Sequence, residues 1–223
     1  LFTSNQIKKF FLKNNKIKII KDDLIIKGYE KKSDHLNPFF SLDKNIVGES
    51  HQKKINKIIP FLKKNKSDLI FITAPENVAW LLNIRGYDNP NSPIPNCHLL
   101  LDYKKNLFLI ANKRKVKNLI KEKKVIPSQI IDPNKFQLFV KKLNGDKIII
   151  DPKTCSLFNE NILKTKFRVL SKEDPIYMLK AIKNKKEIKN MISAHISDGI
   201  ALTKFLYWIK NVNKKKITEF DAQ

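Results

Sequence analysis

The stretch Val78–Asp88 reads Val-Ala-Trp-Leu-Leu-Asn-Ile-Arg-Gly-Tyr-Asp, an apolar, helix-compatible segment that runs straight into a polar turn. The turn contains Arg85, the only arginine in this half of the chain. Arginine carries a rigid, planar fork of donors that suits carboxylates and backbone carbonyls, whereas lysine is a mobile point charge. The simplest interpretation is a helix C-terminus, with Arg85 facing the helix dipole and Gly86 as the cap. A binding role for Arg85 stays open as the alternative.

The composition is that of a globular protein with a strong bias toward lysine. Hydrophobic residues make up 42% of the 223 residues, enough for more than one compact unit. The net charge of +24 suggests nucleic-acid binding, but only three of the 45 basic residues are arginine, and the lysines are spread along the whole chain. With Asn and Ile abundant and only 5 glycines, this pattern is typical of an AT-rich genome. It favours solvated lysine-rich faces over a dedicated nucleic-acid surface.

The residues that usually carry chemistry are dispersed. Cys97 and Cys155 form neither a metal-binding spacing nor a disulfide framework, and they fit a reducing cytoplasm. The four histidines form no ligand cluster, and the apolar runs fall short of the roughly 20 residues that span a bilayer. We therefore expect no membrane segment, no metal ligands and no catalytic residues in this chain.

The N-terminal part predicts a short helix over residues 1–12, capped by Thr3 or Ser4. Two strands are expected at 17–20 and 24–26, and a polar connector over 31–44. Ser50 then caps a helix whose apolar positions, from Ile55 to Leu62, keep helical spacing.

From residue 69 the pattern alternates between strands and helices, which predicts an α/β domain. A buried strand at 69–73 is followed by a helix that Pro75 opens, and a hairpin is expected around Asp102–Asn106. Further strands are predicted at 125–131, 148–150 and 169–170, with helices near 113–122, 132–143 and 154–163.

The pattern changes again at Asp174. Asn184 and Glu187 form a capping box that predicts a long helix to about Asn211, and a further helix starts at 217–219. Because Leu1 is no initiator methionine and Gln223 follows a helix start, we expect both ends to be cut from something longer.

Two separate segments resemble the Xaa-Pro aminopeptidases (aminopeptidase P). Residues 76–88, followed by a proline-containing loop and a strand, are similar to the middle domain of that family. Residues 180–219 resemble the start of its catalytic domain, and residues 1–12 the end of its first domain. The residues of the second match are Lys180-Ala181-Ile182-Lys183-Asn184, Glu187, Ala194-His195, Asp198 to Leu202, Phe205, Trp208 and Ile217-Thr218-Glu219.

The resemblance implies an organisation in three parts. Residues 1–45 would be the C-terminal tail of a first domain, 46–171 a complete middle domain, and 172–223 the truncated start of a catalytic domain. The first two would share a ribonuclease-H-like α/β fold (the creatinase/prolidase N-terminal fold), and the third would open a pita-bread fold.

The resemblance also implies a function that this chain would not perform alone. The parent would be a cytoplasmic, homodimeric metallopeptidase that removes an N-terminal residue preceding proline, with two divalent metal ions, manganese by expectation. None of the residues here aligns with the two Asp, one His and two Glu that hold those metals. The chain would instead shape the mouth of the active site and take part in dimer contacts. Arg85, Asn83 and Asp88 are the substrate-cleft candidates, with Asn83 and Asp88 fixing the turn.

Two other interpretations stay open. One is a non-catalytic binding module with a pita-bread fold, and the other is a basic nucleic-acid-binding protein. We expect neither a specific nucleic-acid partner nor a membrane partner.

Overall fold

The computed structural model describes residues 2–11, 16, 37–212 and 216–222. The expected strands at 17–20 and 24–26 lie outside the described residues. The described residues fall into two compact units. The first contains those up to Asp43 together with Glu49–Ile182, and the second contains Lys44–Gly48 and those from Lys183 onward.

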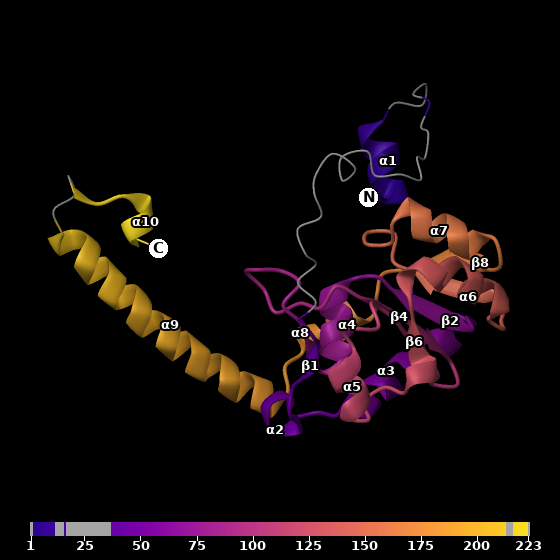
Figure 1. Ribbon diagram of the computed structural model, residues 1–223, viewed down its shortest axis with the longest axis horizontal. Coiled ribbons are helices and arrows are strands. Elements are labelled where there is room, and N and C mark those ends of the chain that lie inside the picture. The colour runs from indigo at the N-terminus through magenta and orange to yellow at the C-terminus, as the bar shows by residue number, and fades with distance from the viewer. Residues whose placement is uncertain (1, 12–15, 17–36, 213–215, 223) are drawn as a thin grey trace. The chain divides into compact units, whose positions relative to one another are not determined.

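A mixed six-stranded sheet forms the centre of the first unit, in the order β6-β5-β4-β2-β7-β8 (Figure 1). Strands β2, β4 and β5 form an antiparallel meander, and β7 and β8 run parallel to β2. This order is that of a ribonuclease-H-like fold, so the predicted α/β class is confirmed. The strands are β2 (Leu69–Ile72), β4 (His98–Asp102), β5 (Leu107–Ile110), β6 (Ile130–Ile131), β7 (Lys147–Ile150) and β8 (Arg168–Ser171).

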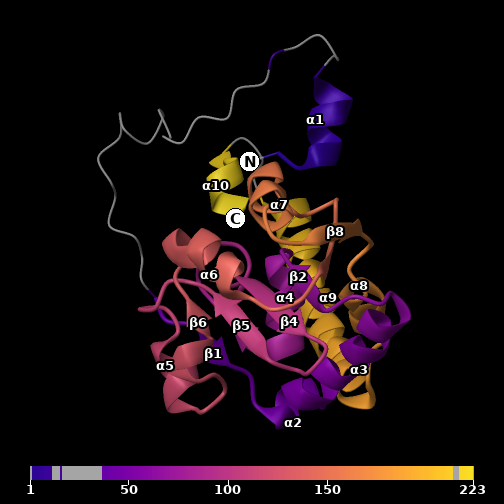
Figure 2. The same cartoon turned by 90° about the vertical axis from the view of Figure 1, so that its right-hand side faces the viewer.

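Helices cover both faces of this sheet (Figure 2). One face packs against α3 (His51–Lys64), α4 (Pro75–Leu82), α5 (Lys117–Lys121) and α8 (Ile176–Ala181). The other packs against α6 (Phe136–Lys142) and α7 (Leu157–Lys164). Strand β2 shows why two cores form, because its alternate residues Ile70 and Ile72 face one cluster while Leu69 and Phe71 face the other. Burial on both faces explains its uninterrupted apolar sequence.

The predicted helix starts are confirmed at most positions. Thr3 caps α1 (Ser4–Phe10), Ser50 caps α3, and Pro75 lies in the first turn of α4. Asp132 caps a short 3₁₀ turn (Pro133–Lys135) that leads into α6, and Ser156 caps α7.

Three expectations need correction. The connector predicted over 31–44 contains β1 (Phe40–Ser41), which pairs with β3 (Ile84–Arg85) in a separate two-stranded sheet. The strand predicted at 125–131 is reduced to β6, because Pro127–Gln129 forms a 3₁₀ turn. The helix near 113–122 is only the five residues of α5. In each case a partner distant in sequence, or a short turn, decides the local structure.

The second unit consists of α2 (Lys44–Val47), the long helix α9 (Lys185–Asn211) and the short α10 (Glu219–Ala222). Asn184 and Glu187 form the predicted capping box at the start of α9. The Asn184 side chain also donates to the carbonyl oxygen of Val47, 2.9 Å away. Gly48, at φ +73°, approaches Asn184 so closely that a Cβ would lie 2.6 Å from its Oδ1. The apolar side chains of α9 are largely exposed, as at Ile196 and Leu202.

Among the residues that the structure describes, four other than glycine have left-handed backbone, namely Lys66, Asn83, Lys105 and Lys123. Lys66 and Lys123 end α3 and α5 with the same hydrogen-bond pattern. The N–H of Ser67 donates to Leu62 O at 3.1 Å, and that of Lys124 donates to Leu119 O at 2.9 Å. These are Schellman motifs with lysine at the position that glycine usually takes.

Replacing Lys66 with glycine should therefore stabilise the protein. The left-handed conformation costs an L-residue roughly 1–2 kcal/mol, of which the added flexibility of glycine in the unfolded chain cancels part. We expect Lys66→Gly to raise the free energy of unfolding in urea by about 0.5–1 kcal/mol. The control Lys63→Gly, one turn earlier inside α3, should lower it by about 1 kcal/mol. Equal losses in both variants would contradict the assignment of strain to Lys66.

Candidate functional site

The turn that follows α4 ends the helix at Asn83 and not at Gly86. Asn83 adopts left-handed backbone (φ 54°, ψ 44°), and its N–H donates to carbonyls of the last helical turn. Asparagine tolerates this conformation better than most residues. The chain then enters β3, where Arg85 pairs with Phe40. The cap predicted at Gly86 is thus wrong by three residues.

Gly86 is required for a different reason. A Cβ at this position would lie 2.8 Å from the Cα of Pro95 and 3.0 Å from the Cδ1 of Phe39. The proline-rich loop therefore packs directly onto the backbone of Gly86, and no larger side chain fits without displacing it.

A buried lysine holds the end of α4. Lys54 on α3 is 1% exposed. Its Nζ donates to Asn83 Oδ1 at 2.7 Å and to Trp80 O at 2.9 Å, and it lies 4.0 Å from the centroid of the Trp80 ring. The ammonium group thus meets an amide oxygen, a C-terminal helix carbonyl and an aromatic face, all of which favour a cation.

Arg85 also serves this helix end. Its Nη1 donates to Ile84 O at 2.8 Å and to Ala79 O at 3.3 Å, so the expected interaction with the helix C-terminus is present. The side chain is half-buried, and this burial lowers the pKa of the guanidinium, which nevertheless stays protonated.

Lys124 is the third cation at this turn. Its Nζ donates to the backbone oxygen of Asn83 at 3.1 Å, and the N–H of Leu42 donates to the same oxygen at 2.9 Å. Lys54, Arg85 and Lys124 therefore converge on the negative end of the α4 dipole.

Asp88 fixes the far side of the turn. Its carboxylate forms an ion pair with Lys115 and accepts a hydrogen bond from the N–H of Asn96 at 2.6 Å. The structure thus brings Asn83, Arg85 and Asp88 onto one turn, where Asn83 is buried, Asp88 is ion-paired and Arg85 is half-buried. Their role at a substrate cleft stays a prediction.

A second polar cluster joins α4 to α8. Asn77 is fully buried, and its Nδ2 donates to Asp174 Oδ2 at 2.7 Å. Lys180 Nζ donates to Asn77 Oδ1 at 2.6 Å. Burial raises the pKa of the Asp174 carboxyl, although the hydrogen bonds from Asn77 and from the N–H of Ile176 oppose the rise. This cluster attaches residues 174–181 to the same helix that carries the Asn83 turn.

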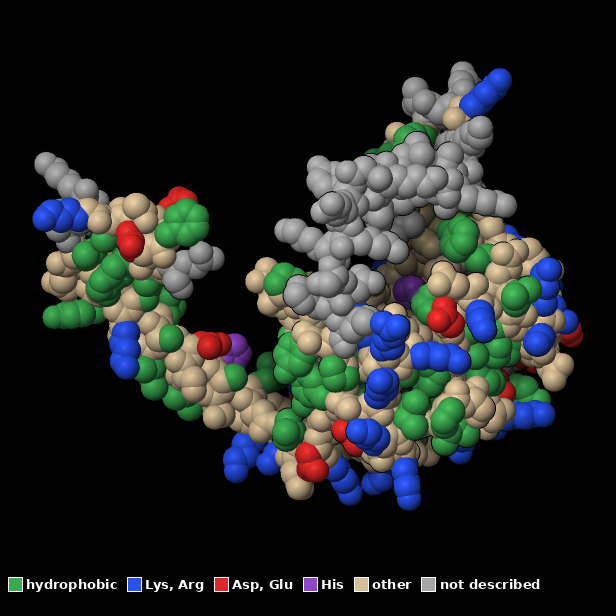
Figure 3. Space-filling model, in the orientation of Figure 1, with side chains coloured by type: hydrophobic (Ala, Val, Ile, Leu, Met, Phe, Trp, Pro, Cys, Tyr) green, Lys and Arg blue, Asp and Glu red, His purple; other side chains and the backbone are tan. Residues whose placement is uncertain are grey.

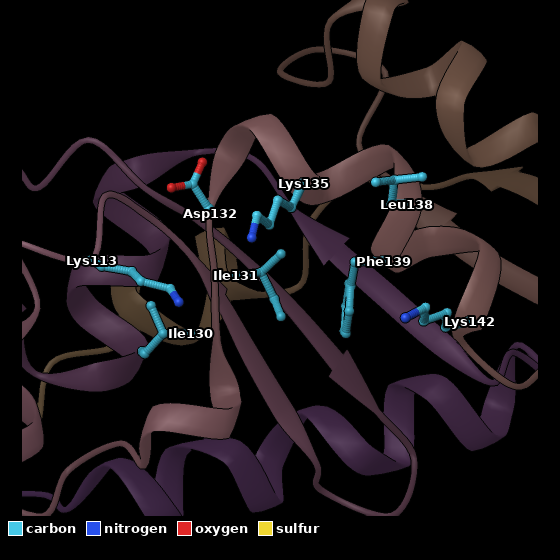
Figure 4. A pocket seen from close by; sticks show the side chains of 8 residues that line it. All are labelled: Lys113, Ile130, Ile131, Asp132, Lys135, Leu138, Phe139 and Lys142. Carbon is cyan, nitrogen blue, oxygen red and sulfur yellow. The ribbon is translucent and has the colours of Figure 1, made fainter.

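The surface also has a hollow of about 370 Å³ beside the edge strand β6 (Figure 4). Apolar side chains, including Ile131 and Phe139, form its floor, and Lys113, Lys135 and Lys142 surround it. The carboxylate of Asp132 accepts the N–H of Asn134 at 2.9 Å and thus belongs to the helix cap. None of the predicted site residues lines this hollow.

In the part of the chain that the structure describes, neither the distribution of charge nor a cluster of metal ligands indicates a second functional site. Lys and Arg side chains are scattered over the face shown in Figure 3, among apolar and neutral ones. Within the described residues, no three His, Cys, Asp or Glu side chains come together as metal ligands would. No described helix is both long and apolar enough to cross a membrane.

Comparison with known proteins identifies the class of this fold. Residues 30–187 match the model of the Creatinase/Prolidase N-terminal domain. The chain therefore belongs to the creatinase/prolidase N-terminal domain family.

Several curated relatives are named as Xaa-Pro aminopeptidases. Xaa-Pro aminopeptidase 1 of Dictyostelium discoideum is 32% identical over 89% of this chain and 31% of its own length. Xaa-Pro aminopeptidase ApepP of Drosophila melanogaster is 27% identical over 80% of this chain and 30% of its own. The chain thus spans about a third of the length of the relatives it matches.

A solved structure shares the fold. The X-prolyl aminopeptidase of Caenorhabditis elegans, described as a cytosolic enzyme with a di-nuclear active site, matches with a TM-score of 0.73. It is 22% identical, and the match covers 89% of this chain and 34% of that one.

Sequence reasoning missed Lys54 and Lys124. For Lys54 a signal was present, because it lies one turn before Ile58 and next to Ile55, on the apolar face of α3. Lys124 gave no such signal, because it is one of several lysines in a lysine-rich segment. Its role depends on contact with a residue 41 positions away.

Replacing Lys54 with methionine should destabilise the first unit. The substitution keeps the side-chain volume but leaves Asn83 Oδ1 and Trp80 O without this donor, which costs about 2–3 kcal/mol of unfolding free energy. Urea denaturation of Lys54→Met measures this loss. Lys53→Met, on the exposed side of the same helix turn, is the matched control and should change stability by less than about 0.5 kcal/mol. Similar effects in both variants would refute the capping role of Lys54.

Proposed function

We propose that this chain is the N-terminal and middle part of an Xaa-Pro aminopeptidase. The observation that carries the proposal is the match of residues 30–187 to the creatinase/prolidase N-terminal domain, together with relatives of about three times its length that are Xaa-Pro aminopeptidases. The parent hydrolyses the bond between an N-terminal residue and proline in the cytoplasm. Two divalent metal ions, manganese in this proposal, supply Lewis-acid chemistry when bound. Their ligands come from outside these 223 residues.

The domain boundaries belong to the same proposal. Residues 1–45 end a first domain, 46–171 form the middle domain, and 172–223 begin the catalytic domain. The exposed apolar side chains of α9, such as Ile192, Ile196 and Ile200, support this division, because a helix of this kind requires a larger domain to cover it. The chain alone is inactive, and in the parent it shapes the mouth of the active site and contributes to a homodimer.

Within the middle domain, we assign Arg85 to the substrate cleft. Its side chain is half-buried, and its Nη1 donates to the carbonyl oxygens of Ala79 and Ile84, which restricts the direction of the guanidinium. The buried Asn83 and the ion-paired Asp88 keep the turn rigid. A rigid planar donor is suited to orienting the backbone or the terminal carboxylate of a short peptide.

The first test compares the 223-residue chain with the longer protein that contains it, both assayed with Mn²⁺ on a peptide that has proline in second position. We expect turnover only from the longer protein, and we expect a chelator to abolish it. Turnover by the 223-residue chain would overturn the assignment of the chemistry to other parts of the protein. A folded longer protein without turnover would favour the non-catalytic binding module.

The second test addresses Arg85 in the longer protein. Because a charge-assisted hydrogen bond is worth about 1.5–3 kcal/mol, Arg85→Ala should lower kcat/KM by roughly tenfold to a hundredfold. Arg114→Ala removes the same charge at an exposed position and should leave kcat/KM unchanged. If Arg85→Ala lowers the Tm but leaves kcat/KM intact, the residue serves only the end of α4.

A further inference from the structure

A small cavity of about 210 Å³ lies where the start of α3 meets the β4–β5 turn and the segment after α5. Three basic side chains line it, His51, Lys105 and Lys124, and three amide side chains, Gln52, Asn56 and Gln129. Two aliphatic side chains complete the lining. Among the described residues, no Asp or Glu contributes to it. Six nitrogen-bearing side chains thus surround a space of molecular size.

Local backbone structure places the basic groups there. His51 is the first residue of α3, and Lys105 occupies a left-handed position (φ 72°) in the hairpin turn. Lys124 follows the Schellman motif of α5, and its ammonium group is anchored to the carbonyl oxygen of Asn83 at 3.1 Å. The cavity therefore draws its positive charges from three separate elements.

The electrostatics of the cavity oppose this concentration of charge. Burial, and then the positive charge of Lys124, lower the pKa of His51. Burial also lowers the pKa of Lys124, against the influence of Glu122.

Two further carboxylates lie on elements next to the cavity, and both have contacts outside its lining. Glu49 forms an ion pair with Lys57 at 2.8 Å, and Asp102 accepts both the N–H and the Nδ2 of Asn106. The lining of the cavity itself thus combines three basic side chains with no carboxylate among the described residues, and Glu122 is the carboxylate that acts on Lys124. An anion is the class of ligand whose charge complements this lining.

We propose that this cavity binds a small oxyanion, a phosphate group or a dicarboxylate, between His51, Lys105 and Lys124. The three cations neutralise its charge, and the amides of Gln52, Asn56 and Gln129 offer hydrogen bonds to its oxygens. Because the anion favours protonated His51, it binds more tightly below the pKa of His51, and its affinity falls as the pH rises through that value.

The test follows the four histidine ring signals of the 223-residue chain by NMR between pH 5 and 8. Sulfate, whose charge is constant over this range, serves as the phosphate probe, succinate as the dicarboxylate probe, and chloride at equal ionic strength as the reference. We expect the pKa of His51 to rise by about 0.5–1 unit in sulfate or succinate relative to chloride. The probe with the larger shift identifies the kind of oxyanion, and the other three histidines serve as internal references.

Variants separate a built site from the general attraction of a basic chain for anions. Lys105→Asn removes one cavity charge and suits the left-handed position, so it should retain the fold and at least halve the His51 shift. Lys121→Gln removes an equal charge from an exposed position outside the cavity and should leave the shift unchanged. Equal His51 titrations in all three salts, or equal effects of both variants, would overturn the proposal.

Discussion

The hydrogen bonds of the buried Lys54 ammonium group decide where α4 ends, and the rest of the turn depends on them. Lys54 reaches from α3 to Trp80 O and Asn83 Oδ1, at 2.9 and 2.7 Å. A buried cation is costly unless its donors are satisfied, so this arrangement requires Asn83 in its left-handed conformation. That conformation in turn directs the chain into β3, next to β1. The position of Arg85 thus follows from a residue 31 positions earlier in the sequence.

The scarcity of glycine shapes the turns of this protein. The sequence has only 5 glycines in 223 residues, and among the described residues Lys66, Asn83, Lys105 and Lys123 adopt positive φ in addition to Gly48 and Gly145. Such positions cost lysine roughly 1–2 kcal/mol each, and the packed helices on either side must compensate for that cost. Among the glycines whose surroundings are described, Gly48, Gly86 and Gly145 each allow an approach closer than a Cβ would tolerate.

Local signals made most of the fold predictable from the sequence. Ser50, Pro75 and Asn184 each start the expected helix, because caps act through neighbours in the chain. The short strand β1 could not be predicted, and β6 is shorter than predicted, because the partners of such strands and the turns beside them decide their extent. The candidate site around Arg85 also combines local signals with partners that are distant in the sequence. The Val78–Asp88 stretch marked the correct turn, but Lys54 and Lys124 reach it from other elements and leave little trace in a sequence so rich in lysine.

The conformation of the turn after α4 therefore depends more on residues from other elements than on the residues of the turn itself. Three cations from three elements meet at one helix C-terminus, where backbone carbonyls carry partial negative charge. The carbonyls alone balance only part of this charge, since a helix end is equivalent to about half an elementary charge. Lys124 also lines the cavity beside His51, and the Arg85 side chain is half-buried. An anionic group bound on either side of the turn, either from a peptide or from a small oxyanion, would neutralise positive charge that the helix carbonyls do not.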